Sequence, residues 1–584
     1  MKQILLEYLS QLKEREELDA ILPDLLSELG YHVYSRPQRG TTQHGVDIAA
    51  VGKDPDDGVR KVYLFSVKRG DLTRQEWDQG DQALRPSLNQ IRDAYIPTKI
   101  PSKYAALPIV VCLVFGGTVR ENIQLEVRGY TKSNTTPKVS YEEWNGDKLA
   151  ELLMDGVLRE KVLPAELQTS FRKAIALVDE PDVAYRHFGD LARQVRKGKS
   201  TPASLLVAAR QLSICCWIMY VWGRSGGNIE APFRATELAL LHVWDIARPQ
   251  IGTRTRAFKD LTQVLLQLLA LYRTIVSELI DRIAPHVKNR DAIASSVGGS
   301  ALDVNLALFD LLGRIAVSGL WTGWLAQRLP QLSDESRKVI DKHIDVGLSL
   351  IANNSTMALP VTDEQATSVA LFLLLWCQGS SEREQVGPWI QAMVRRYCHT
   401  IGLRKSYPTC KTAYRELLIH PIDGSDAYFE EATAGSTLIP LLAVWATALG
   451  ETLAAQKLAD LVAKELTHCT LQLWTVDGAS DQHLYVNDDN HGRAIFDLKA
   501  GDVVGAVAML EEVRVTFNDF AQLSAIRAGW WPMVLTACRH WRLPVPIDFY
   551  SPILATSIAV PASDGQTAAA HDENQNPAAA AAEP

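Results

Sequence analysis

The sequence predicts a multidomain chain, in which an N-terminal α/β domain is followed by a mostly α-helical region of irregular, repeat-like character. Two observations predict it. A chain of 584 residues is too long for one hydrophobic core. Helix and strand patterns alternate up to about residue 165, and amphipathic helical segments then follow one another almost without strands. We therefore expect domains at residues 1–165 and 166–555, and a disordered Ala/Pro-rich tail at 556–584.

The first element of the N-terminal domain is a helix at residues 5–29. Its apolar residues recur at helical spacing, and it ends at Gly30, a residue type that commonly follows a helix. Pro23 lies inside this segment and lacks a backbone N–H group. We therefore expect the helix to be kinked or broken at Pro23.

Strand patterns follow the helix. Three are short and rich in β-branched or aromatic residues, and they lie at residues 31–34, 46–51 and 61–69. The turn sequence GKDPDDG separates the second from the third and predicts a hairpin. The acids of this turn lack the spacing of a calcium loop, so we expect solvated side chains at Asp54, Asp56 and Asp57.

The rest of the domain returns to alternating patterns. A helix is predicted at residues 73–95, with a break around Pro86. The run LPIVVCLVF at residues 107–115 is apolar throughout, which is typical of a strand buried on both faces. A last strand at 139–144 precedes a helix that starts at 146–153.

The second region is predicted to be helical almost throughout. Its Trp residues lie at helical spacing among Leu, Val and Ala, so we expect them to pack in a core. Its expected helices are 168–178, 184–196, 202–222, 232–248, 257–285, 301–328, 332–352, 364–378, 384–401, 411–418, 435–466, 503–512 and 518–542.

Composition narrows the class of protein. The chain is 47% hydrophobic with a net charge of −8, so it is not coated with basic residues, although a local basic cleft is still allowed. None of the eight cysteines forms a CxxC pair, and we expect buried free thiols. The N-terminus is too charged for a signal peptide, and the apolar stretches are poor membrane spans. The sequence therefore predicts a cytoplasmic protein with no membrane partner.

The predicted hairpin contains the residues that could take part in catalysis. Side chains alternate between the faces of a strand, so Ser66 and Lys68 should share a face. Asp47 begins the other arm, and a hairpin of matched length would bring it to the same end. A carboxylate there could bind Mg²⁺ or Mn²⁺, which activates water, and an ammonium group could stabilise developing negative charge. This pattern favours phosphodiester hydrolysis.

The order LLSELGY, GVDI and LFSVKRGDL resembles the restriction-endonuclease-like PD-(D/E)xK fold, especially its type IV (Mrr-like) branch, over residues 15–155. The resemblance implies that Asp47 binds metal and that Lys68 is the catalytic lysine. It also implies an acid on the first helix, for which Asp19 has the expected spacing and Asp24 and Glu28 compete. A glutamine on the helix after the lysine often faces the site, and this sequence offers Gln82 or Gln90.

The sequence departs from this family at one important position. Ser66 stands where the (D/E)-x-K triplet has an acid, and a hydroxyl is the weaker metal ligand. The chain is therefore expected to be either a metal-dependent DNA endonuclease or a decayed nuclease fold that binds nucleic acid beside a helical interaction scaffold. DNA contacts are expected from the basic residues Arg36, Arg39, Arg69 and Arg74.

The helical region is expected to regulate the first domain. Its segments GRSGGN and SSVGGS lack the ending of a phosphate-binding loop, and the loose His/Asp cluster at residues 483–491 is an ordinary loop composition. By analogy with nucleases fused to large regulatory regions, we expect an effector of bacterial restriction or anti-phage defence. The expected partners are DNA, a protein or phage-derived trigger, and a second copy of the chain.

Overall fold

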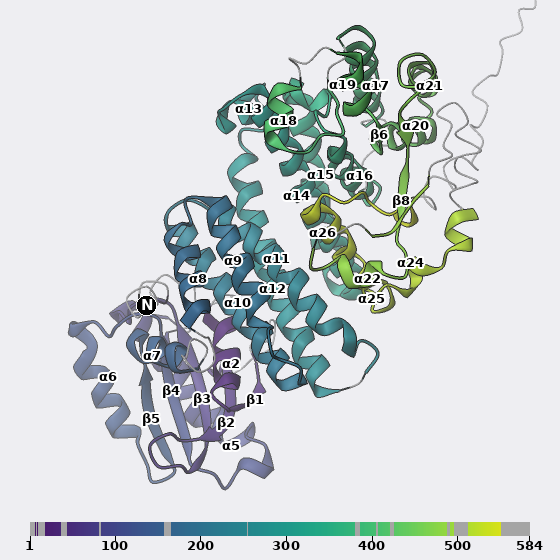
Figure 1. The fold of residues 1–584 in the computed structure, drawn as a ribbon. Helices are drawn as coiled ribbons and strands as arrows, with labels where there is room; N and C mark the ends of the chain where they lie inside the picture. The colour runs from purple at the N-terminus through teal and green to yellow at the C-terminus, as the bar shows by residue number, and fades with distance from the viewer. Residues whose placement is uncertain are drawn as a thin grey trace, which may run out of the picture.

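The structure is a computed structural model with an N-terminal sheet domain and a larger helical region (Figure 1). The residues that it describes are 6, 9, 18–36, 44–80, 83–156, 165–253, 255–379, 386–404, 407–420, 425–487, 491–495 and 512–550. The expected tail at 556–584 and most of the expected helix at 503–512 lie outside them.

The N-terminal sheet is mixed. Its strands lie in the order in which they occur in the chain: β1 (His32–Ser35), β2 (Ile48–Lys53), β3 (Arg60–Lys68), β4 (Ile109–Phe115) and β5 (Val139–Trp144). The pairs β1–β2 and β2–β3 are antiparallel, as the predicted hairpin requires, and β3–β4 and β4–β5 are parallel. The strands of a parallel pair need a long crossover between them, and helices provide both crossovers.

Helices cover both faces of this sheet. On one face, α2 (Asp19–Glu28) and α7 (Gly146–Gly156) share a core with the strand residues Ile48, Phe65 and Val67. On the other face lie α3 (Arg74–Asp78), α4 (Leu84–Gln90) and α6 (Glu121–Asn134), which pack on residues such as Leu64 and Leu113. Successive apolar side chains of β3 therefore pack alternately into two separate cores, one on each face of the sheet.

Three details of this domain differ from the sequence-based expectations. Helix α3 ends at Asp78 and α4 begins at Leu84, so Pro86 falls in the first turn of α4, where a missing N–H group costs little. Helix α2 continues through Pro23. The crossover helix α6 was not predicted, because Ile123 and Val127 are its only residues classed as buried and its apolar periodicity is faint.

The rest of the chain is mostly helical, as predicted. Its longest helices are α10 (Pro202–Ser225), α12 (Arg256–Ile283), α14 (Ala301–Arg328) and α15 (Ser333–Asn353). Within the described residues, the other helices of eight or more residues in this region are α8 (Ala165–Ala176), α9 (Pro181–Val195), α11 (Glu230–Ala247), α16 (Ala366–Trp376), α17 (Gly387–His399), α20 (Leu438–Ala448), α21 (Thr452–Glu465) and α26 (Pro532–Trp541).

Two local features of the helical region were not expected. The helix predicted at 435–466 is divided into α20 and α21 at Gly450, which adopts a left-handed conformation with φ of 79°. Short strand pairs also occur, β6 (Gly435–Ser436) with β7 (Thr470–Leu471) and β8 (Leu473–Thr475) with β9 (Arg493–Ile495).

The core that begins on the α2 face of the sheet continues through the helical region. Helices α10, α12 and α14 are each long and apolar enough to cross a membrane by length and composition, and 78%, 56% and 72% of their most apolar windows are buried within the protein. Their apolar character is therefore used in packing between helices.

The eight cysteines are all free thiols, and half of them are buried. The buried ones are Cys112, Cys215, Cys216 and Cys538. The expectation of buried thiols is wrong for Cys377, which is exposed, and only partly met by the remaining three, which are half-buried.

Candidate functional site

The β2–β3 hairpin brings Asp47 and Ser66 together. Ile48 pairs with Phe65 across the two strands, and the backbone N–H of Asp47 donates to the carbonyl of Phe65 at 2.9 Å. Asp47 therefore lies just before the paired part of β2, with its backbone bonded to the residue that precedes Ser66. The end of the hairpin where the sequence placed the site is where these residues meet.

Ser66 and Lys68 point toward the face covered by α3, α4 and α6. They alternate with Phe65 and Val67, which lie in the core on the α2 face. Ser66 is 1% exposed and Lys68 is 4% exposed, so both side chains are enclosed by the fold. The lysine is therefore held within the domain, and its position is not the solvated strand end that a lone lysine usually occupies.

The carboxylate of Asp47 is anchored by the backbone of β3. Its Oδ2 accepts a hydrogen bond from the N–H of Val67 at 2.8 Å. Strand β2 begins at Ile48 whereas β3 continues to Lys68, so a carboxylate oxygen takes the place of a backbone carbonyl where the strands separate. The orientation of Asp47 is thereby fixed relative to Lys68.

The loop before Asp47 is held by close contact with α4. Gly45 has φ of 79°, and a Cβ atom at this position would lie 2.2 Å from the carbonyl oxygen of Ser87. His44 beside it also has a positive φ, of 50°, which is uncommon for a residue with a side chain. Sequence reasoning missed this close approach, although the Gly three residues before a strand was a usable signal.

The first-helix acids are placed differently from the hairpin residues. Asp19 lies in α2, which packs on the face of the sheet opposite to Ser66 and Lys68, and the side chains of Asp19 and Glu28 lie outside the described residues. Asp24 is buried, with its Oδ1 3.6 Å from Arg36 and 4.0 Å from Arg210. The structure therefore joins Asp24 to arginines of both regions of the chain.

The glutamine positions are the least informative part of the predicted site. Gln90 is exposed and is the last residue of α4, and Gln82 lies outside the described residues. The residues of α4 that are buried toward the sheet are Leu84 and Leu88.

An acid that the sequence analysis did not single out, Asp71, lies just beyond the strand that carries Lys68. Its Oδ1 accepts the backbone N–H of Thr118 at 2.8 Å, and its Oδ2 lies 2.7 Å from Arg120. These contacts tie the loop after β3 to the loop after β4. The signal was an acid three residues after Lys68 at the carboxyl end of a predicted strand.

The hairpin turn corrects one prediction. Asp54 is 6% exposed and accepts hydrogen bonds from Lys61 Nζ at 2.7 Å and from the Tyr63 hydroxyl at 3.2 Å. The hydrogen bond from Lys61 holds the pKa of the Asp54 carboxyl below its usual value. Asp56 and Asp57 are exposed, as expected. The prediction that the acids of this turn are solvated is therefore wrong only for Asp54.

The oxygen donors near Lys68 are sparse. Among the described residues no three His, Cys, Asp or Glu side chains are grouped to hold a metal ion. Asp47 and the Ser66 hydroxyl are the donors that the hairpin brings together. Mg²⁺ is often bound by one or two carboxylates and completed by water and substrate phosphates. The residues therefore fit Mg²⁺ or Mn²⁺ as part of a complex with a phosphate-bearing substrate.

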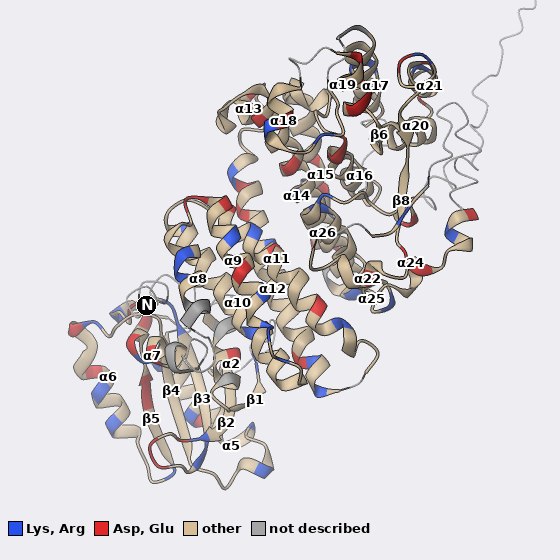
Figure 2. Ribbon diagram, viewed as in Figure 1, with Lys and Arg blue, Asp and Glu red and all other residues tan. Residues whose placement is uncertain are grey.

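The predicted DNA-contacting arginines have acidic neighbours. Arg69 lies 3.4 Å from Glu76, and Arg74 pairs with Glu126. Arg39 lies outside the described residues. Figure 2 shows Lys and Arg interspersed with Asp and Glu over the N-terminal domain, without one continuous basic stretch. Any phosphate contact by Arg69 or Arg74 would have to compete with these ion pairs.

Comparison with known proteins found no match to this chain. No protein-family model matches the chain, and neither a curated protein nor a solved structure matches it. The geometry of the hairpin is therefore the main indication of function.

Proposed function

We propose that this protein is a metal-dependent DNA endonuclease whose N-terminal domain has the PD-(D/E)xK type of active site and whose helical region regulates it. The observation that supports the proposal best is that Asp47 is hydrogen-bonded to Phe65 and Val67, the two residues on either side of Ser66, with Lys68 next along β3. A carboxylate, a hydroxyl and an ammonium group at one end of a sheet are suited to phosphodiester hydrolysis.

Each residue has a separate task in this proposal. Asp47 and Ser66 would hold Mg²⁺ or Mn²⁺, which when bound supplies Lewis acidity and a water of lowered pKa. Lys68 would place positive charge beside the phosphate as negative charge develops on its oxygens. The hydrogen bond from Val67 fixes the direction of the Asp47 carboxylate before substrate binds.

The proposal extends to the biological setting by analogy. A restriction-like nuclease joined to a large helical region suits a cytoplasmic effector of bacterial restriction or anti-phage defence. The helical region would then respond to a protein partner or a phage-derived trigger.

Conservative variants of the full-length protein test the nuclease. Asp47→Asn keeps an oxygen that can accept the Val67 N–H but removes the charge, and Lys68→Met keeps a long buried side chain. With plasmid DNA and Mg²⁺ or Mn²⁺, each variant should cut at least about a hundredfold more slowly than wild type. Asp56→Asn and Lys53→Met, which change exposed residues of the same hairpin, should cut like wild type. Equal cutting by wild type and Asp47→Asn would contradict the proposal.

A second candidate function is nucleic-acid binding by a decayed nuclease fold. Ser66 favours it, because a hydroxyl stands at this position of β3, beside the residues that hold Asp47, where a second carboxylate would strengthen metal binding. This candidate predicts DNA binding without cutting by the wild type, and cutting that appears when an acid is restored by Ser66→Glu. The nuclease proposal instead predicts cutting by the wild type with Mg²⁺ or Mn²⁺ alone.

A further inference from the structure

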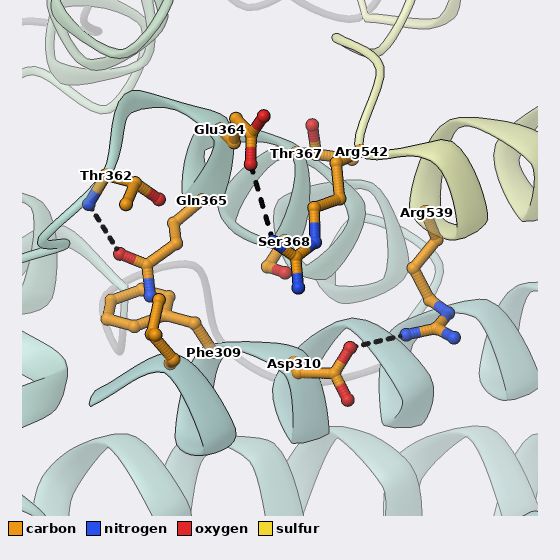
Figure 3. Close-up of a pocket in the computed structure, with 10 residues that line it drawn as sticks. Phe309, Asp310, Thr362, Glu364, Gln365, Thr367, Ser368, Arg539 and Arg542 are labelled. Carbon is orange, nitrogen blue, oxygen red and sulfur yellow. Dashed lines mark hydrogen bonds and ion pairs between the residues drawn. The ribbon is translucent and has the colours of Figure 1, made fainter. Parts of the chain in front are cut away.

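A small open cavity lies in the helical region, far along the chain from the sheet domain. It has a volume of about 50 Å³ and is formed where α14, α16 and α26 meet (Figure 3). Its walls include Phe309 and Asp310 from α14, Ser368 from α16, and the arginines Arg539 and Arg542 from the C-terminal end of α26. Three segments separated by many residues therefore build one pocket.

One wall carries a fixed negative charge. Asp310 lies 2.8 Å from Arg539 through Oδ1 and accepts a hydrogen bond from Arg314 at 2.6 Å through Oδ2. Burial alone would raise the pKa of Asp310, but the guanidinium groups of Arg314, Arg539 and Arg542 outweigh burial and hold the pKa well below its usual value. Both carboxylate oxygens are held by arginines, and 41% of the side-chain surface remains exposed at the cavity, where a ligand could meet the ionised group.

The opposite wall carries a positive charge that is loosely held. The Nη1 atom of Arg542 lies 3.6 Å from Glu364, and its side chain is 65% exposed. Figure 3 shows the guanidinium directed between Glu364, Ser368 and Asp310. By contrast, Arg539 is nearly buried and makes two hydrogen bonds to Glu237. Arg542 therefore has donor capacity that its own ion pair does not use.

The backbone of Arg542 is also unusual. Arg542 ends α26 in the left-handed conformation, with φ of 57° and ψ of 31°. Glycine is favoured at such a helix end, and a residue with a Cβ atom adopts the conformation at a cost in free energy. The strained conformation directs the guanidinium over the pocket, which points to a use for this side chain beyond packing.

We propose that this pocket binds the head group of a small zwitterion of the α-amino acid type. The ligand ammonium would face Asp310, and its carboxylate would replace Glu364 as the partner of Arg542, with the Ser368 hydroxyl as a further donor. Phe309 and Leu306 provide an apolar side for the ligand's carbon atoms.

The size and charge of the pocket select this class of ligand. A water-sized group needs on the order of 10–15 Å³, so the cavity holds about four such groups, close to the head group of an amino acid. A simple anion would be repelled by Asp310 and Glu364, and a simple cation by Arg539 and Arg542. Any larger side group would extend through the open mouth.

Calorimetry with the full-length protein tests the proposal. Glycine and L-serine are the zwitterionic probes, and acetate and ethylammonium carry each charge alone. The zwitterions should bind, and each single-charge probe should bind at least about tenfold more weakly. Arg542→Gly should weaken glycine binding by about tenfold or more, while its melting temperature should not fall because glycine suits the left-handed position.

Two controls keep the test decisive. Arg542→Asn, which also tolerates this conformation, should lose binding in the same way as Arg542→Gly. Arg290→Gln removes an exposed arginine that does not line the pocket and should bind like wild type. The proposal is overturned if wild type binds neither zwitterion more tightly than acetate and ethylammonium, or if Arg542→Gly binds glycine as tightly as wild type.

Discussion

His343 is a titratable side chain that the fold removes from water. It is 4% exposed on α15, and its ring nitrogens contact the carbonyl of Val339 at 2.7 Å and the hydroxyl of Ser318 on α14 at 3.2 Å. Burial lowers its pKa to about 4. Both ring nitrogens have partners in the folded protein. The fold therefore stabilises the neutral imidazole relative to the protonated one.

This histidine should make the protein less stable in mild acid. The unfolded chain takes up the proton at a pH near 6.5 and the folded protein only near 4, so the free energy of unfolding should fall as the pH drops through this interval. His343→Gln keeps polar contacts without titrating. In urea unfolding at pH 7 and pH 5, the variant should show a smaller stability difference between the two pH values than wild type. An unchanged difference would contradict this.

At the scale of elements, glycines set how closely helices approach. Gly347 lies on α15, and a Cβ atom there would meet the Phe372 ring of α16 at 2.2 Å. Gly319 and Gly323 of α14 similarly face the side chains of Leu375 and Gln378. The small residues let α16 pack closely against both α14 and α15, and a rigid aromatic ring leaves little room for adjustment.

Two alanine substitutions should therefore have opposite effects. Gly347→Ala should lower the free energy of unfolding by about 1–3 kcal/mol, because overpacking outweighs the gain in helix propensity. Gly129→Ala, in the exposed part of α6 where nothing lies within 4 Å, should raise it by up to about 1 kcal/mol. Denaturant unfolding of both variants measures the contrast, and a Gly347→Ala variant as stable as Gly129→Ala would show that α16 can move away.

At the scale of the whole molecule, a buried charge network joins α26 to α11, two helices that are far apart in the sequence. Glu237 of α11 is fully buried and accepts hydrogen bonds from Arg539 of α26 at 2.8 and 2.5 Å, with His540 and the Tyr272 hydroxyl as further partners. Burial would raise the pKa of Glu237, but the charge of Arg539 and contact with His540 lower it to about 2.

Removing one partner of this network should be costly. Arg539→Met leaves the buried Glu237 carboxylate without its main counter-charge and should lower the free energy of unfolding by about 3–5 kcal/mol. The double variant Glu237→Gln/Arg539→Met removes the uncompensated charge and should recover part of the loss. Urea unfolding of both proteins checks the order. A double variant less stable than the single one would mean that hydrogen bonds, and not charge, dominate the network.

The strands with a clear pattern were predictable because the apolar or polar character of their side chains indicates directly which faces are buried. Strand β5 has the predicted bounds, and β4 lies within the predicted apolar run. Helix α6 was missed because so little of it is buried. The division of the segment at 435–466 was missed because a single Gly inside a helical pattern does not by itself show that the helix ends there.

The hairpin on which the candidate site depends was predictable to a similar degree. The hairpin pattern placed Asp47, Ser66 and Lys68 at one end of the sheet, because strand alternation and turn position are local properties. The hydrogen bond from Val67 to Asp47 and the contact of Gly45 with Ser87 were not predictable, since both depend on where strands end and where α4 lies. Asp54 was misplaced for the same reason.

The sequence by itself determined the division into a sheet domain and a helical region, and the shared face of Ser66 and Lys68. The periodicity of apolar residues and the alternation along a strand depend only on residues that are close together in the sequence. Only the tertiary structure decided which side chains from distant segments meet, such as Arg210 with Asp24 and Arg542 with Glu364. These contacts depend on the packing of whole helices. The identity of a residue's partner across a core does not alter the apolar periodicity of the sequence around that residue, so it cannot be predicted from that sequence.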